Sequence, residues 1–130
     1  MGSQAIKICF MVDDDIDDQE IFSIALNEID QKVDCVFANN GIEALQKLHE
    51  DLLFEPDYIF LDLNMPKMNG KQCLEEIKKI SRLSQTPVII YSTSSEKKSI
   101  AEVKLIGASA YFTKPSSISE LAKKLAEFLK

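Results

Sequence analysis

The feature that most constrains this chain is the alternation of short apolar runs with longer segments in which apolar side chains recur every three or four residues. Residues 8–12 form an uninterrupted apolar run that is too short for a helix and typical of a strand buried on both faces. Further strands are predicted at residues 33–38, 58–61, 88–91 and 110–112. The mixed composition of residues 33–38 favours an edge strand for that segment.

The segments between these runs have the periodicity of amphipathic helices. The first segment has one apolar stripe, and Asp17 with Glu20 three residues later predicts an N-cap and a capping box. The residues of that stripe are Ile21, Phe22, Ala25, Leu26 and Ile29. The other stripes are Ile42/Leu45/Leu48, Leu74/Ile77/Ile80, Ile100/Val103/Ile106 and Leu121/Leu125/Phe128/Leu129. The sequence therefore predicts five strand–helix units.

Buried strands separated by amphipathic helices indicate a parallel sheet with helices on both faces and right-handed crossovers. We therefore predict an α/β fold, a doubly wound five-stranded sheet with five helices. The 130 residues leave room for one ordinary hydrophobic core, so residues 1–130 are expected to form a single domain. Residues 1–4 are expected to be a flexible terminus or a cloning remnant.

Composition and charge exclude several classes of protein. Residues 1–64 hold 15 acidic and 3 basic side chains, whereas residues 65–130 hold 6 and 12, which gives net charges of −12 and +6. Direct nucleic-acid binding is not expected, because it favours a strongly basic domain and these lysines are dispersed. No run approaches the roughly 20 apolar residues that span a bilayer, so no membrane association is expected. Cys9, Cys35 and Cys73 form no CxxC motif, which indicates a reduced, cytoplasmic setting.

Polar side chains follow four of the predicted strands, at the point where each strand ends. They are Asp13, Asp14 and Asp15, then Asp62 and Asn64, then Ser92 and Thr93, then Thr113 and Lys114. The carboxyl ends of parallel strands form one edge of the sheet, where ligands bind. Clustered carboxylates suit a hard divalent cation such as Mg²⁺. A carboxylate beside that ion and a lysine is a candidate nucleophile for phosphoryl transfer, and Asp62 is the central one.

The residues at these strand ends also form four motifs. They are Val12-Asp13-Asp14-Asp15, Leu61-Asp62-Leu63-Asn64-Met65-Pro66 with Gly70, Val88-Ile89-Ile90-Tyr91-Ser92-Thr93, and Tyr111-Phe112-Thr113-Lys114-Pro115. In this order the motifs resemble the receiver domain of bacterial two-component response regulators, over nearly the whole chain. The resemblance implies a flavodoxin-like sheet with strand order 2-1-3-4-5. It also implies a signalling phosphoprotein whose only catalysis is Mg²⁺-dependent self-phosphorylation and autodephosphorylation.

The resemblance assigns a role to each matching position. Asp62 corresponds to the phosphoacceptor, while Asp13 and Asp14 correspond to the acid pair that holds Mg²⁺. In that family the second acid ligates the ion directly and the first acts through water. Asp62 and the main-chain carbonyl of Asn64 would complete the protein ligands.

A second group of positions corresponds to residues that bind the phosphoryl group and respond to it. Ser92 matches the hydroxyl that bonds to the phosphoryl group, and Lys114 matches the lysine that does the same. Tyr111 matches the aromatic switch that moves together with Ser92. The Lys114–Pro115 bond corresponds to a cis peptide in the family.

The resemblance implies a histidine kinase or a histidine phosphotransfer protein as the phosphodonor. Output would pass to a downstream protein or to a second copy through the helix from about residue 96 to 106, the fifth strand and the last helix. If the chain is complete, output is by protein contact, and if it is a fragment, an effector domain lies elsewhere. The kinase, the target, the phosphorylation lifetime and the oligomeric state have no signature in the sequence.

Two alternatives to the signalling receiver fit the sequence less well. A haloacid-dehalogenase-like phosphatase also forms an aspartyl phosphate with Mg²⁺, but its nucleophile motif has a second aspartate where this chain has Asn64, and the chain has no room for a cap domain. A degenerate receiver that serves only as a binding module would not need the acid pair, Asp62, Ser92 and Lys114 together. The signalling receiver is therefore the favoured interpretation.

Overall fold

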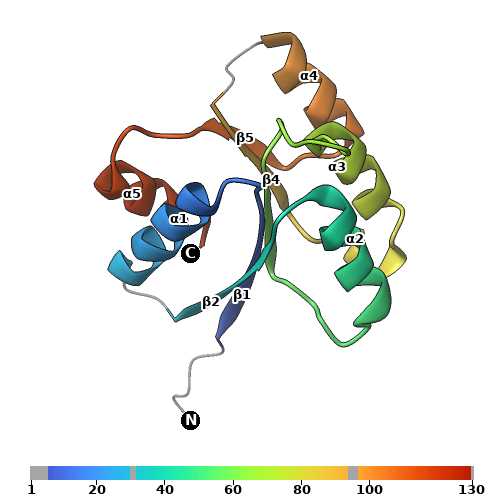
Figure 1. The fold of residues 1–130 in the computed structure, drawn as a ribbon, viewed down its shortest axis with the longest axis horizontal. Coiled ribbons are helices and arrows are strands. Elements are labelled where there is room, and N and C mark those ends of the chain that lie inside the picture. The colour runs from blue at the N-terminus through green and yellow to red at the C-terminus, as the bar shows by residue number, and fades with distance from the viewer. Residues whose placement is uncertain (1–5, 30–31, 94–96, 130) are drawn as a thin grey trace.

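Five parallel strands form the central sheet of the computed structural model, which describes residues 6–29, 32–93 and 97–129 (Figure 1). The strands are β1 (Lys7–Val12), β2 (Val33–Ala38), β3 (Tyr58–Leu61), β4 (Val88–Ser92) and β5 (Ala110–Thr113). Their order across the sheet is β2-β1-β3-β4-β5, and all four pairings are parallel. The expected strand order and the edge position of β2 are confirmed.

In the described residues, four α-helices connect successive strands and a fifth follows β5, and together they cover both faces of the sheet. They are α1 (Ile16–Glu28), α2 (Gly41–Glu50), α3 (Gly70–Lys78), α4 (Lys97–Ile106) and α5 (Ile118–Phe128), and a short 3₁₀ turn, η1 (Ser81–Leu83), precedes β4. Helices α1 and α5 lie on one face, and α2, α3 and α4 lie on the other (Figure 1). Residue 96, where the fourth helix was expected to begin, lies outside the described residues. The doubly wound arrangement that the sequence predicts is confirmed.

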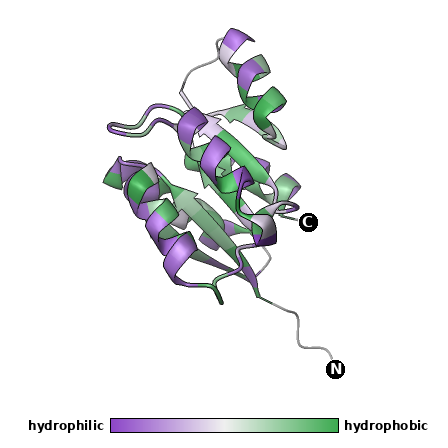
Figure 2. Cartoon of the chain, turned by 90° about the vertical axis from the view of Figure 1, so that its right-hand side faces the viewer, coloured by the Kyte–Doolittle hydropathy of each residue, from purple (hydrophilic) through white to green (hydrophobic). Residues whose placement is uncertain are grey.

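The strand side chains alternate between two hydrophobic cores. Phe10 and Val12 of β1 pack in the core beneath α2, α3 and α4, whereas Cys9 and Met11 pack in the core beneath α1 and α5. All four of these side chains are buried, which explains why the strand reads as a continuous apolar run. In Figure 2 the strands are mainly hydrophobic and the helices also carry hydrophilic residues, while a few large apolar side chains of the helices are exposed, including Ile21 of the stripe predicted for the first helix. Among the described residues, no helix combines the length and the apolar character needed to cross a membrane.

The start of α1 differs from the expectation. Asp15, not Asp17, is the N-cap: its carboxylate accepts hydrogen bonds from the main-chain N–H groups of Asp17 and Asp18, at 2.9 and 3.3 Å. Asp15 has an extended backbone, while Asp17 already lies in the helix. The predicted capping box of Asp17 and Glu20 is therefore wrong. Several consecutive acids could each have served as the cap, and the apolar periodicity that would choose among them begins only at Ile21.

Candidate functional site

The carboxylates at the ends of β1 and β3 meet because these strands are neighbours in register. Val12 pairs with Leu61, so Asp13 and Asp62 follow at adjacent positions at the edge of the sheet. Asp13, Asp14 and Asp62 each offer a carboxylate oxygen, and these oxygens all lie within 4.8 Å of one another. Asp13 and Asp62 are buried, whereas Asp14 is exposed. Three carboxylates at this separation, one open to solvent, form an oxygen-only donor set that fits a hard divalent cation.

The two oxygens of Asp13 already have partners within the protein. Oδ1 accepts a hydrogen bond from the main-chain N–H of Asp15 at 3.0 Å, and Oδ2 accepts one from the Lys114 ammonium at 2.9 Å. The side-chain amide of Gln19 donates to the carbonyl of Asp13 at 2.8 Å and so fixes the loop after β1. This arrangement leaves Asp14 and Asp62 better placed than Asp13 for direct contact with a cation.

Lys114 follows β5 and reaches over the site toward α1. Its main-chain N–H donates to the carbonyl of Ser92 at 2.8 Å, which ties the end of β5 to the end of β4. Its Nζ lies 5.1 Å from the centre of the Tyr91 ring and 3.8 Å from Oδ1 of Asp62. Burial alone disfavours the ammonium, but hydrogen bonds to Asp18 and Asp13 outweigh that cost, so the pKa of Lys114 is raised.

Asp18 is a member of this cluster that the sequence reasoning missed. Its Oδ2 accepts a hydrogen bond from Nζ of Lys114 at 2.6 Å. The two residues are far apart in the sequence, and their contact depends on how α1 packs against α5. No motif or spacing encodes that packing, so only the three-dimensional structure could reveal the pair.

Asp62 is a weaker acid than an ordinary aspartate. Burial raises the pKa of Asp62 to about 6, and the negative charges of Asp13 and Asp14 act in the same direction. The Lys114 ammonium and the main-chain N–H of Asn64 oppose this shift. Burial likewise raises the pKa of Asp13. The cluster is therefore electrostatically strained when its carboxylates are ionised, and a bound cation would relieve that repulsion.

The raised pKa of Asp62 predicts that the free energy of unfolding depends on pH. The pKa of Asp62 is about 6 in the fold, whereas its ordinary value is 3.8. The protonated side chain therefore stabilises the fold fully below about pH 3.8, and this stabilisation is lost as the pH rises through about 6. The Asp62→Asn variant cannot ionise, so without divalent cations it should be more stable than the parent above that pH, by about 1–3 kcal/mol. Urea unfolding in EDTA at about pH 5 and about pH 8 measures the difference. An advantage that does not grow with pH would contradict this account.

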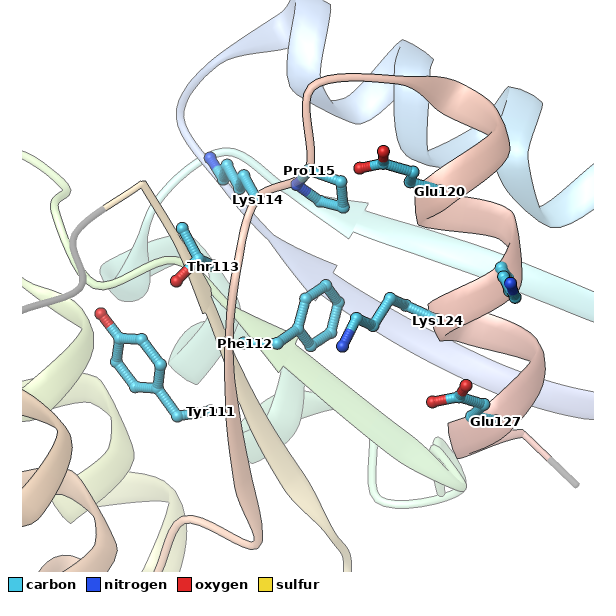
Figure 3. A pocket seen from close by; sticks show the side chains of 9 residues that line it. Tyr111, Phe112, Thr113, Lys114, Pro115, Glu120, Lys124 and Glu127 are labelled. Carbon is cyan, nitrogen blue, oxygen red and sulfur yellow. The ribbon is translucent and has the colours of Figure 1, made fainter.

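The remaining predicted site residues are positioned by β4, β5 and the loop after β3. Ser92, the last residue of β4, is buried and pairs in register with Thr113 of β5, while Asn64 is exposed in the loop after β3. Tyr111 is half-buried and packs with the core beneath α2, α3 and α4. In Figure 3, Tyr111 and Phe112 extend to opposite sides of β5.

The peptide bond after Lys114 differs from the expectation. The described residues contain no cis peptide bond, so the bond between Lys114 and Pro115 is trans. The cis bond implied by the resemblance is therefore wrong. Lys114 is instead held by its main-chain hydrogen bond to Ser92 and by its ammonium contacts with Asp13 and Asp18.

The loop that carries Asp62 is packed tightly against the start of α3. The main-chain N–H of Gly70 donates to the carbonyl of Leu63 at 2.9 Å. A β-carbon at position 70 would lie 2.2 Å from the carbonyl oxygen of Asp62, so only glycine fits. Lys67, in the same loop, has a φ of 67°, in the left-handed region. This loop is thus a defined structure that fixes the position of the Asp62 carboxylate.

Comparison with known proteins identifies the family. Residues 9–126 match the model of the response regulator receiver domain. This chain belongs to that receiver family. The family and the fold inferred from the four motifs are thus confirmed, and the comparisons give no support to the haloacid-dehalogenase-like phosphatase.

Curated relatives of this receiver include proteins of different length. The transcriptional regulatory protein CpxR homolog of Haemophilus influenzae is 35% identical over 120 residues, which cover 92% of this chain and 49% of that protein. Sporulation initiation phosphotransferase F of Bacillus subtilis is 33% identical over 116 residues, which cover 88% of this chain and 90% of that protein. The receiver therefore spans about half the length of the first relative and most of the second.

Solved structures of response regulators share the fold of this receiver. The phosphorylated cyanobacterial phytochrome response regulator RcpA is 30% identical, with a TM-score of 0.86 and coverage of 95% of this chain and 91% of that one. The Mn²⁺-bound form of response regulator Rcp1 is 25% identical, with a TM-score of 0.82 and coverage of 94% and 91%.

Proposed function

We propose that this receiver, as a single domain, accepts a phosphoryl group on Asp62 from a histidine kinase or a histidine phosphotransfer protein, in a reaction that requires Mg²⁺. The observation that carries this proposal is the cluster around Asp62: two further carboxylates with oxygens within 4.8 Å, and the Lys114 ammonium 3.8 Å away. The relative that was solved in its phosphorylated form and the one that was solved with Mn²⁺ support it.

The proposed chemistry assigns one task to each group. A carboxylate oxygen of Asp62 forms a bond to phosphorus while the phosphorus–nitrogen bond of the donor phosphohistidine breaks, and the departing imidazole keeps that electron pair and takes up a proton. The Lys114 ammonium and the Ser92 hydroxyl donate hydrogen bonds to the transferred oxygens. Asp14, Asp62 and the main-chain carbonyl of Asn64 would hold Mg²⁺, with Asp13 acting through water. The ion supplies neutralisation of the negative charge on the transferring group.

The experiment that tests this proposal uses small phosphodonors in place of the kinase. With phosphoramidate or acetyl phosphate and Mg²⁺, intact-mass spectrometry should show the gain of one phosphoryl group, and peptide mapping should locate it at Asp62. EDTA should abolish the gain, and so should Asp62→Asn. Asp34→Asn, at an exposed position on β2, serves as the control and should be phosphorylated like the parent. A gain that survives Asp62→Asn, or no gain with any donor, would remove the proposal.

We further propose that phosphorylation is read out on the surface formed by α4, β5 and α5. A dianionic phosphoryl group on Asp62 would draw Ser92 and Lys114 inward, and Tyr111 would move into the space beside β4. A cavity of about 710 Å³ lies on this surface, lined from Tyr111 to Pro115 and by charged residues of α5 (Figure 3). The lysines of α4, namely Lys97, Lys98 and Lys104, offer positive charge to an acidic downstream protein or to a second copy.

Beryllofluoride, a mimic of the phosphoryl group, makes this readout measurable. When it is added with Mg²⁺, amide NMR should show shifts at residues 97–112 as well as in the loops around Asp14 and Asp62. The expected cause is the movement of Ser92 and Tyr111. If the shifts stay confined to the two loops while residues 97–112 are unchanged, the proposed switch is wrong.

A further inference from the structure

The hydrogen bonds of the Lys114 ammonium in the unphosphorylated receiver suggest a control on its movement. An ammonium group has three N–H donors. Asp18 lies at 2.6 Å and Asp13 at 2.9 Å, whereas Asp62 lies at 3.8 Å, beyond hydrogen-bond distance. The lysine is thus hydrogen-bonded on the side of the site formed by β1 and α1, and its contact with the phosphoacceptor is a longer ion pair without a hydrogen bond.

The two carboxylates that hold this lysine differ in what else fixes them. Asp13 is fully buried, and its second oxygen accepts the main-chain N–H of Asp15. Asp18 extends from the first turn of α1 and keeps 27% of its side chain exposed, whereas the Lys114 side chain keeps 10%. Asp18 therefore joins α1 to the loop after β5 through one charge-assisted hydrogen bond, and that bond is the shortest that Lys114 makes.

We propose that Asp18 is a positioning residue that restrains the Lys114 ammonium on the α1 side of the site and so opposes its engagement by a phosphoryl group on Asp62. This inference rests on the proposed phosphorylation of Asp62. A phosphoryl group on Asp62 and the carboxylate of Asp18 are both anionic acceptors, so they compete for the charge of the same ammonium. The carboxylate of Asp18 thereby favours the unphosphorylated state.

The restraint predicts the direction in which replacing Asp18 changes the affinity for beryllofluoride. With Mg²⁺ in excess, Asp18→Asn should tighten the binding of beryllofluoride roughly three- to tenfold, because a neutral amide holds the ammonium less strongly. Asp17→Asn is the matched control, since Asp17 lies in the same first turn of α1, is exposed and carries the same charge, but makes no ion pair with Lys114. It should change the affinity much less. In a Lys114→Met background, the two substitutions should have equal effects.

Isothermal titration calorimetry measures these affinities, and the melting temperatures establish that each variant is folded. Equal effects of Asp18→Asn and Asp17→Asn in the parent background would overturn the inference. The loss of one negative charge near the site would then account for both effects. Weaker binding of beryllofluoride by Asp18→Asn would also overturn it, since Asp18 would then assist the lysine.

A second measurement needs no phosphoryl mimic. NMR relaxation of the Lys114 Cε methylene should show greater mobility in Asp18→Asn than in Asp17→Asn, and equal mobility would overturn the inference. If the parent fails to bind beryllofluoride, the proposed function fails, while the relaxation result still decides whether Asp18 holds the lysine.

Discussion

Replacing Asp14 with asparagine should weaken Mg²⁺ binding and slow the phosphorylation of Asp62, each by roughly ten- to hundredfold. Asp14 contributes the exposed carboxylate of the cluster, whose oxygen lies within 4.8 Å of those of Asp13 and Asp62. Because both oxygens of Asp13 bond to protein donors, Asp14 is better placed than Asp13 to bind the ion directly. A neutral amide at this position would remove a charged ligand and leave the phosphoryl oxygens less neutralised.

Asp15 provides the matched control for this prediction. Asp15 adjoins Asp14 in the sequence, but its carboxylate caps α1 and accepts the N–H groups of Asp17 and Asp18. Asp15→Ser removes the same charge and retains a residue that caps helices well. The variant should therefore keep most of the affinity for Mg²⁺. Thermal shift against Mg²⁺ concentration and intact-mass spectrometry with phosphoramidate measure the two effects, and an equal loss in both variants would mean that the ligands are misassigned.

The fold was largely predictable because its central strands are buried on both faces. A continuous apolar run such as residues 58–61, placed between two helical stripes, is typical of a buried parallel strand, and parallel strands bring their carboxyl ends to one edge. Asp13, Asp14 and Asp62 could therefore be grouped from the sequence alone. The same logic could group Lys114 with them, since it follows the fifth strand.

The details that the sequence did not predict depend on tertiary contacts or on choices between equivalent residues. The contact between Asp18 and Lys114 depends on how α1 packs against α5, and residue spacing carries no information about that packing. The N-cap at Asp15 was missed because neighbouring acids have the same capping chemistry. The isomer of the Lys114–Pro115 bond was inferred from a resemblance, and tertiary context decides such bonds one at a time.

Replacing Gly70 with alanine should lower the free energy of unfolding by about 2–4 kcal/mol. The new methyl group would lie 2.2 Å from the carbonyl oxygen of Asp62 and 2.7 Å from the α-carbon of Leu63. Both neighbours are main-chain atoms, so the loop after β3 must move as a unit. Since that loop carries the Asp62 carboxylate, the affinity for Mg²⁺ should fall together with the stability.

Gly41 separates this clash from the general effect of alanine at the start of a helix. Gly41 is the first residue of α2 and Gly70 the first of α3, and each follows an asparagine N-cap. The three atoms nearest to a β-carbon at position 41 would all belong to side chains, with the flexible Met68 nearest at 3.1 Å. Gly41→Ala should therefore change the stability by no more than about 1 kcal/mol. Urea unfolding with and without Mg²⁺ compares the variants. If Gly70→Ala unfolds at the same urea concentration as Gly41→Ala, the close approach of α3 does not fix the loop that carries Asp62.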